Sequence, residues 1–150
     1  MENKRKKLYK IFIVGICISL VIVVFALWKN TKKIRSVEIN NHEISVEVMD
    51  TPHKRQQGLS GREELCENCG MLFVFDEVGE YSFWMKDMLF DIDIVWIRGG
   101  SVVSVLSDVS SKTPTVSLMP PESVDRVLEL PAGQVEKIGI IQGTGVQYIK

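Results

Sequence analysis

The sequence predicts a mainly β protein: a small barrel or sandwich of about eight short strands with two short helices, preceded by one transmembrane helix. Three observations predict this class. A long apolar run lies near the N-terminus, short runs of β-branched and aromatic residues recur after it, and turn-forming residues separate those runs. The chain of 150 residues has room for one domain of ordinary size beside the helix.

Residues 8–28 form the long apolar run, in which Lys10 is the one charged residue. As a helix, these 21 residues extend about 31 Å, which matches the roughly 30 Å hydrocarbon core of a bilayer. The run is longer than the apolar part of a signal peptide, and bulky residues such as Trp28 stand where a cleavage site needs small ones. We expect an uncleaved transmembrane anchor, followed by a polar tether over residues 29–35.

The charges that set membrane orientation are nearly balanced, because five basic residues precede or open the apolar run and four follow it closely. A short basic N-terminus ahead of the first apolar span usually stays inside the cell. We therefore expect residues 1–7 to be cytoplasmic. Residues 36–150 are then expected to form an extracytoplasmic domain held at the cell membrane by a single-pass anchor.

The two parts of the chain carry opposite charge, although the formal net charge of the whole is -1. Nine of the 18 Lys and Arg residues, but one of the 19 acidic residues, lie within residues 1–35. The rest of the chain therefore holds nine basic and 18 acidic residues, a formal net charge of -9. Binding to nucleic acid depends on cations that neutralise phosphates. We expect no nucleic-acid partner for this acidic domain.

Eight short runs of β-branched, aromatic and aliphatic residues predict the strands. They cover residues 37–39, 44–49, 71–75, 81–85, 92–97, 102–106, 127–130 and 146–149. The pairs Asn40-Asn41 and Gly99-Gly100 are typical of tight hairpin turns. Residues 107–123 are too many for such a turn, and they predict a long loop that is a candidate rim of a binding site.

Two short helices are predicted between the strands. Thr51 supplies a side-chain cap and Pro52 fits the first helical position, so a helix is expected to begin there and to end near Gly58. Residues 131–138 predict one or two further helical turns. With the strands, these helices complete the expected small barrel or sandwich.

Five groups of residues, in the same order, resemble one known family. They are Thr51…Arg55…Gly58-Leu59…Arg62, Gly70-Met71-Leu72-Phe73-Val74-Phe75, Phe83-Trp84-Met85-Lys86, Asp93-Ile94 and Val127-Leu128-Glu129-Leu130-Pro131-Ala132-Gly133. Over nearly the whole of residues 37–150 the chain resembles the domain-of-unknown-function-192 family. The resemblance implies a compact β-rich domain, often exported or membrane-anchored, with no agreed activity. The chain departs from the family at Asp87-Met88, where Asn-Thr is usual, and at Asp91, where Pro is usual.

Asp91 and Asp93 are the first candidates for a functional site, because residues two apart on a strand project from the same face. Asp93 lies inside an apolar run, and a buried carboxylate needs a cation or several hydrogen-bond donors. Two close carboxylates can also share a proton or bind Ca²⁺. No resident metal and no cofactor is predicted from this pair.

One interpretation is a polar ligand-binding pocket in which Asp93 pairs with Arg62 or Lys86. Its candidate residues are Arg55, Arg62, Trp84, Lys86, Asp91 and Asp93. The alternative is a structural salt bridge that holds the first helix on the sheet, with Trp84 used for packing rather than for stacking on a ligand. Glu129 lies on the strand face opposite its two leucine neighbours, and we expect it to be either solvated or paired with an arginine.

Cys66 and Cys69 have three readings. A zinc site needs four ligands, and the other candidates, His42 and His53, lie in no recognisable spacing. A thioredoxin-like redox pair belongs at the start of a helix, whereas this pair precedes a strand. A local disulfide in an oxidising exterior, or two free thiols in a loop, is favoured.

No motif in the sequence specifies a reaction: there is no nucleophile elbow, phosphate loop or metalloprotease helix. The sequence therefore favours a non-catalytic binding module for a small ligand, an envelope polymer or a protein partner over an enzyme. One alternative is a carboxylate-dependent hydrolase that uses Asp91 and Asp93 with Lys86. The other is a purely structural component of a membrane complex.

Overall fold

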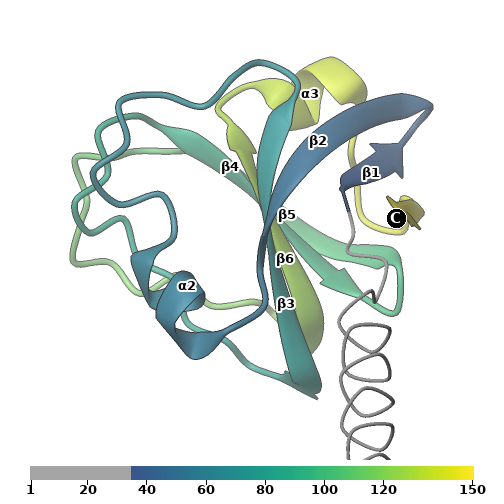
Figure 1. Cartoon of the computed structure of the whole chain (residues 1–150), viewed down its shortest axis with the longest axis horizontal. Helices are drawn as coiled ribbons and strands as arrows, with labels where there is room; N and C mark the ends of the chain where they lie inside the picture. Colours follow the sequence, from purple (N-terminus) through teal and green to yellow (C-terminus); the bar gives the residue numbers. More distant parts are fainter. Residues whose placement is uncertain (1–34) are drawn as a thin grey trace, which may run out of the picture. The chain divides into compact units, whose positions relative to one another are not determined.

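Seven β-strands form one sheet in the order β5-β4-β6-β3-β2-β1-β7 (Figure 1). The computed structural model of this chain describes residues 35–150. The strands are β1 (Ser36–Ile39), β2 (His42–Met49), β3 (Cys69–Gly79), β4 (Ile92–Arg98), β5 (Ser101–Val109), β6 (Val124–Pro131) and β7 (Val146–Ile149). The helices are α2 (Pro52–Gln57) and α3 (Gln134–Ile138).

The anchor predicted over residues 8–28 and the segment predicted to be cytoplasmic over residues 1–7 lie outside the described residues, as does most of the predicted tether. Within residues 35–150, no helix has the length and apolar character needed to cross a membrane.

The sheet curls into a half-barrel whose two ends approach each other (Figure 1). The start of β5 and the turn before it meet the start of β7 and the residues before that strand: the Val102 amide donates a hydrogen bond to the Thr144 carbonyl (2.9 Å), and the Val146 amide donates one to the Gly100 carbonyl (2.8 Å). All neighbouring strands are antiparallel except β2 and β3. The mainly β class predicted from the sequence is confirmed, in the form of this half-barrel.

The prediction of a strand at residues 81–85 is wrong, so the described sheet has seven strands rather than eight. One isolated bridge joins Phe83 to Leu118, with reciprocal amide-to-carbonyl hydrogen bonds of 2.9 and 2.8 Å. Phe83 and Met85 are buried, whereas Trp84 between them is 51% exposed. The alternation that predicted a strand belongs to a loop in which every second side chain packs onto the sheet.

Both predicted hairpin turns are confirmed. Asn40 and Asn41 have φ angles of 49° and 63°, and Gly99 and Gly100 have φ angles of 58° and 81°. Two successive positive φ angles follow the right-handed twist of the flanking strands. Asparagine and glycine are the residues that tolerate this conformation best.

Helix α2 begins where the sequence predicts, since the Thr51 hydroxyl accepts a hydrogen bond of 3.4 Å from the Lys54 amide and Pro52 is the first helical residue. The parallel strands β2 and β3 need a crossover connection, and α2 lies within it. Helix α3 begins at Gln134, later than expected, because Pro131 still belongs to β6.

Both faces of the sheet are buried, because successive side chains of a strand point to opposite faces. The cluster that fills the half-barrel includes Val37, Leu72, Val95, Ile97, Leu128 and Leu130. The cluster on the other face includes Met71, Phe73, Phe83, Ile94, Trp96 and Val127. This second cluster lies next to a cavity whose walls include Arg55, Glu129 and several aromatic side chains.

Candidate functional site

A cavity of about 210 Å³ lies between α2, the loop from Tyr81 to Met88 and the outer face of the sheet. Its aromatic lining residues are Phe73, Phe75, Tyr81, Phe83 and Trp84. Arg55 is the cationic residue of the lining, and Glu129 is its carboxylic acid. The sequence hypothesis named Arg55 and Trp84 as ligand-binding candidates, and the structure brings both to this cavity.

The aromatic walls are held in place by contacts among themselves. Phe75 and Tyr81 stack with ring centroids 3.5 Å apart and ring planes within 7°. Phe83 contacts Phe73 edge to face at 4.8 Å and Trp96 edge to face at 5.3 Å. Such pairs add about 0.5–1.5 kcal/mol each beyond the burial of area. The loop that covers the cavity is therefore fixed to the sheet by its aromatic side chains.

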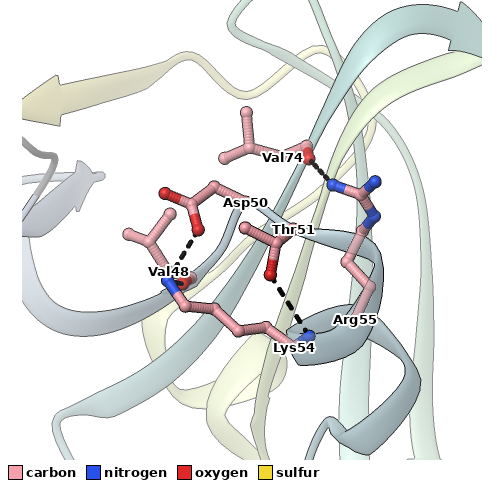
Figure 2. A network of polar contacts seen from close by, with 6 residues as sticks. All are labelled: Val48, Asp50, Thr51, Lys54, Arg55 and Val74. Atoms are coloured by element: carbon pink, nitrogen blue, oxygen red, sulfur yellow. Dashed lines mark hydrogen bonds and ion pairs between the residues drawn. The ribbon is translucent and has the colours of Figure 1, made fainter.

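Arg55 extends from α2 across one wall of the cavity. Its Cζ atom lies 5.2 Å from the centroid of the Phe75 ring, and its Nη1 atom donates a hydrogen bond of 2.9 Å to the Val74 carbonyl. Figure 2 shows that the preceding residue, Lys54, turns to the other side of the helix, where it forms an ion pair of 2.6 Å with Asp50. Within the described part of the chain, Arg55 forms no ion pair.

Glu129 of β6 supplies the carboxyl group of the cavity. It is 6% exposed and lies between Met71 of β3 and Ile94 of β4 on the sheet. Its Oε2 atom has no hydrogen-bond partner among the described residues. Burial raises the pKa of this carboxyl to about 8, because a charge is poorly solvated between apolar neighbours. At neutral pH the group is therefore mostly protonated.

Glu129 was expected to be solvated or paired with an arginine, and both expectations are wrong. The nearest arginine in sequence, Arg126, forms an ion pair with Asp125 instead. A signal was present in the sequence, because Glu129 interrupts an apolar run in which both strand faces turn out to be buried. To predict the burial of Glu129 from this signal, one has to know that α2 and the loop from Tyr81 to Met88 cover the outer face of the sheet.

Asp93 does not contribute to a ligand pocket. Its side chain is fully buried, and it accepts hydrogen bonds of 2.8 Å from the Asp108 amide and 2.8 Å from the Val135 amide. The predicted pairing with Arg62 or Lys86 is wrong, because backbone donors satisfy this carboxylate. The expectation of several donors for a buried carboxylate holds.

Asp91 lies just before β4 and is exposed. Its Oδ1 atom accepts hydrogen bonds from the amide (2.7 Å) and the hydroxyl (2.8 Å) of Ser111. These bonds hold the pKa of the Asp91 carboxyl below its usual range, since they favour the ionised form. Asp91 and Asp93 thus have separate sets of donors, and neither lines the cavity.

The remaining candidates lie outside the cavity. Arg62 forms an exposed ion pair of 2.6 Å with Glu47. Lys86 lines a shallow groove together with residues of the loop that includes Val116. Trp84, which is half exposed, lines both the groove and the cavity, as do Ser82 and Phe83.

Cys66 and Cys69 form a disulfide with a Cα–Cα distance of 5.1 Å, directly before and at the start of β3. Of the readings left open by the sequence, the structure contains the local disulfide. Within residues 35–150, no group of His, Cys, Asp and Glu side chains is arranged to hold a metal ion.

The lining of the cavity combines aromatic, charged and hydroxyl-bearing side chains. Its two serine hydroxyls are engaged elsewhere: Ser60 donates to the Lys86 carbonyl (2.9 Å) and Ser82 bonds to Ser117 (2.8 Å). No His or Cys is among the described residues that line it. Aromatic walls together with polar groups such as those of Arg55 and Glu129 can cover, orient and select a ligand.

Two solved structures share this fold. A protein of Sinorhizobium meliloti 1021, provisionally described as a transcription regulator, aligns with a TM-score of 0.70 and 27% identity over 75% of this chain and 90% of its own. A protein of unknown function from Novosphingobium aromaticivorans DSM 12444 aligns with a TM-score of 0.71 and 24% identity over 76% of this chain and 84% of its own. The second likeness shows the fold alone.

No curated protein sequence matches this chain. The sequence profile of one family matches residues 35–148, which is nearly all of the β domain. The family is described as "Uncharacterized ACR", so its description brings no activity to the chain. The match confirms the resemblance on which the sequence interpretation rested, and the chain belongs to the DUF192 family.

Proposed function

We propose that the β domain is a non-catalytic binding module that holds a small molecule in the cavity beside Glu129. One observation carries the proposal: the Glu129 carboxyl is buried, lines the cavity and has an oxygen without a partner among the described residues. A buried polar atom left without a hydrogen bond destabilises a fold by about 1–3 kcal/mol. A ligand that supplies this bond removes the deficit, and the aromatic walls cover its apolar part.

The alternative of a hydrolase that uses Asp91 and Asp93 has little support. Asp93 has no exposed surface and both of its oxygens accept bonds from backbone amides, so it is not placed to touch a substrate. A general base must lie within hydrogen-bond reach of the proton that it removes.

Binding is tested with a panel of small ring compounds and the purified full-length chain. Compounds that bind are expected to raise the melting temperature, because they bind the folded state alone. A variant that narrows the cavity, Gln57→Trp, is expected to lose most of this shift, since Gln57 lines the cavity from the end of α2. The matched control is His53→Trp, on the same helix but outside the lining.

Binding in the cavity predicts that the control keeps the melting shifts of the unmodified chain. Equal shifts in Gln57→Trp and His53→Trp would place the ligands elsewhere on the domain. If no compound at millimolar concentration raises the melting temperature of the unmodified chain or of the His53→Trp control, the binding proposal fails. The alternative of a purely structural component of a membrane complex then takes its place.

We also propose that residues 8–28 anchor the module in the cell membrane, with the domain outside the cytoplasm. Support comes from the length of the apolar run and from the Cys66–Cys69 disulfide, a bond that persists mainly in oxidising compartments. The full-length chain is expected in the membrane pellet after a carbonate wash, and a chain that lacks residues 1–34 in the soluble fraction. Full-length protein in the soluble fraction contradicts the anchor.

A further inference from the structure

We infer that the cavity takes an elongated organic anion: a small carboxylic acid with an aromatic body and an uncharged hydrogen-bonding group at its far end. In this arrangement Arg55 binds the carboxylate and Glu129 binds the far group. The inference rests on the proposed function and specifies the ligand of the same cavity.

Arg55 is the charged group that the cavity leaves available. Its guanidinium forms a hydrogen bond to the Val74 carbonyl and lies over the face of Phe75, but no carboxylate of the described residues pairs with it. The neighbouring cation, Lys54, is already paired with Asp50 (Figure 2). A guanidinium has five N–H donors in a planar fork that matches a carboxylate. An anionic group is therefore the natural partner at this end.

Arg55 and Glu129 lie beside the two ends of one stretch of β3, from Met71 to Phe75. Arg55 lies over Phe75, whereas Glu129 is opposite Met71 in the pairing of β3 with β6. Phe75 and Met71 are four residues apart on β3, which corresponds to about 13 Å of extended strand. One small polar group cannot contact both ends, so the ligand must be elongated, with a polar group at each end.

Aromatic side chains of the lining lie between these two ends. Phe73 lies between Met71 and Phe75 on the same face of β3, and Phe83 contacts it edge to face at 4.8 Å. A volume of about 210 Å³ equals roughly seven water molecules of liquid density. A single substituted ring fits this volume, and ring-to-ring contacts favour an aromatic body over an aliphatic one.

The end at Glu129 favours an uncharged group. Its neighbours on the sheet are apolar, and burial raises the pKa of its carboxyl to about 8. A protonated carboxyl offers one donor and one acceptor, which a hydroxyl or carbonyl group satisfies without a second buried charge. An ammonium group at this end has to bring its charge into the same apolar surroundings.

The test uses calorimetric titration of the full-length chain at pH 6.5 with three probes that differ by one group. The probes are 4-hydroxyphenylacetate, phenylacetate, which lacks the hydroxyl, and tyramine, which carries a protonated aminomethyl group in place of the carboxylate. We expect 4-hydroxyphenylacetate to bind about tenfold more tightly than either of the others, as the loss of one hydrogen bond or ion pair requires. Equal affinity for 4-hydroxyphenylacetate and tyramine would overturn the role of Arg55.

Substitutions at two positions assign the ends. Arg55→Gln is expected to remove the preference for 4-hydroxyphenylacetate over tyramine and to keep the preference over phenylacetate. Glu129→Leu is expected to remove the preference for 4-hydroxyphenylacetate over phenylacetate and to keep the preference over tyramine. Glu129→Gln, which keeps a donor and an acceptor, is expected to retain both preferences. If circular dichroism shows that Arg55→Gln does not fold, the role of Arg55 is decided by the affinities of the unmodified chain for the three probes.

The outcomes separate this inference from the proposed function. If other compounds of the panel bind and Gln57→Trp blocks them, but none of the three probes binds, the anion inference fails and the binding module stands. If the variants change affinity for all three probes alike, the assignment of the two ends fails. If neither the panel nor the probes bind, both proposals fail.

Discussion

Asp93 in β4 accepts a hydrogen bond of 2.8 Å from the backbone amide of Val135, in the first turn of α3. Its other carboxylate oxygen accepts one of 2.8 Å from the amide of Asp108, which belongs to β5. A single buried side chain thus joins a central strand, a neighbouring strand and a helix. Its role is to hold these elements together.

Asp93→Asn is expected to lower the free energy of unfolding by about 2–4 kcal/mol, because bonds to a charged acceptor are lost and an amide NH₂ then faces a backbone donor. Urea denaturation of the variant measures this change. The control is Asp91→Asn, two residues away and exposed, which is expected to change stability far less. An Asp93→Asn variant as stable as the control contradicts the structural role.

The stability contributed by Glu129 is expected to depend on pH. The folded protein keeps this proton up to about pH 8, whereas a glutamate in the unfolded chain loses it near its ordinary pKa of 4.5. The folded state therefore binds more protons between these values, and stability falls as pH rises through them. The loss is roughly 3–5 kcal/mol, at about 1.4 kcal/mol for each unit of pKa.

Glu129→Gln removes this titration without changing the shape of the side chain. The difference in unfolding free energy between the variant and the unmodified chain should therefore grow in favour of the variant from pH 5 to pH 8. It should stay constant above pH 8, where both folded and unfolded glutamate are ionised. Urea titrations at pH 5, 7, 9 and 10 measure the difference. A difference that does not change with pH shows that the carboxyl is solvated.

Gly70 is required by close packing. A Cβ atom at this position would lie 2.9 Å from Leu128 Cδ1 and 3.2 Å from the Glu129 carbonyl oxygen. Gly70→Ala is expected to destabilise the fold by about 1–3 kcal/mol, as overpacking does in other cores. The matched control is Gly145→Ala, where a Cβ meets nothing within 4 Å. Thermal unfolding compares the two variants, and equal melting temperatures contradict the steric explanation.

Asn40 connects the first hairpin to the end of α3. Its side-chain amide donates hydrogen bonds to the carbonyls of Ile138 (3.1 Å) and Gly139 (2.8 Å). Asn40→Ala is therefore expected to cost about 1–2 kcal/mol more than Asn41→Ala. Both residues have positive φ angles, so the backbone strain of the two substitutions largely cancels in the comparison. If denaturant unfolding shows that both variants lose the same unfolding free energy, the loss comes from the turn and not from the bonds to α3 and Gly139.

Local patterns in the sequence predicted most of the fold correctly. The Asn40-Asn41 and Gly99-Gly100 turns, the Thr51-Pro52 helix start and seven of the strands depend on residues close in the chain, so their signals are complete in the sequence. The wrong prediction of a strand at residues 81–85 also comes from relying on a local pattern. Alternating burial there arises from packing against the sheet, and a periodicity does not reveal whether a segment pairs with a neighbour.

The candidate site was predicted only in part. Arg55 and Trp84 were found because they lie in groups of residues that resemble the family, and both line the cavity. Asp93 was placed in the site because a buried carboxylate is unusual, but the backbone amides that satisfy it come from positions 15 and 42 residues away. Every residue except proline has the same backbone donor, so no sequence pattern indicates which amides will bond to Asp93.

The amino-acid sequence by itself determined the β class, the turns, the start of α2 and the family, because these follow from local preferences and from groups of residues in a fixed order. The tertiary structure alone decided which acid is satisfied and which is not. Asp93 and Glu129 both stand in apolar strands, yet one meets amides from β5 and α3 and the other meets none among the described residues. Solvation of a buried charge depends on what the rest of the chain brings within 3 Å of it.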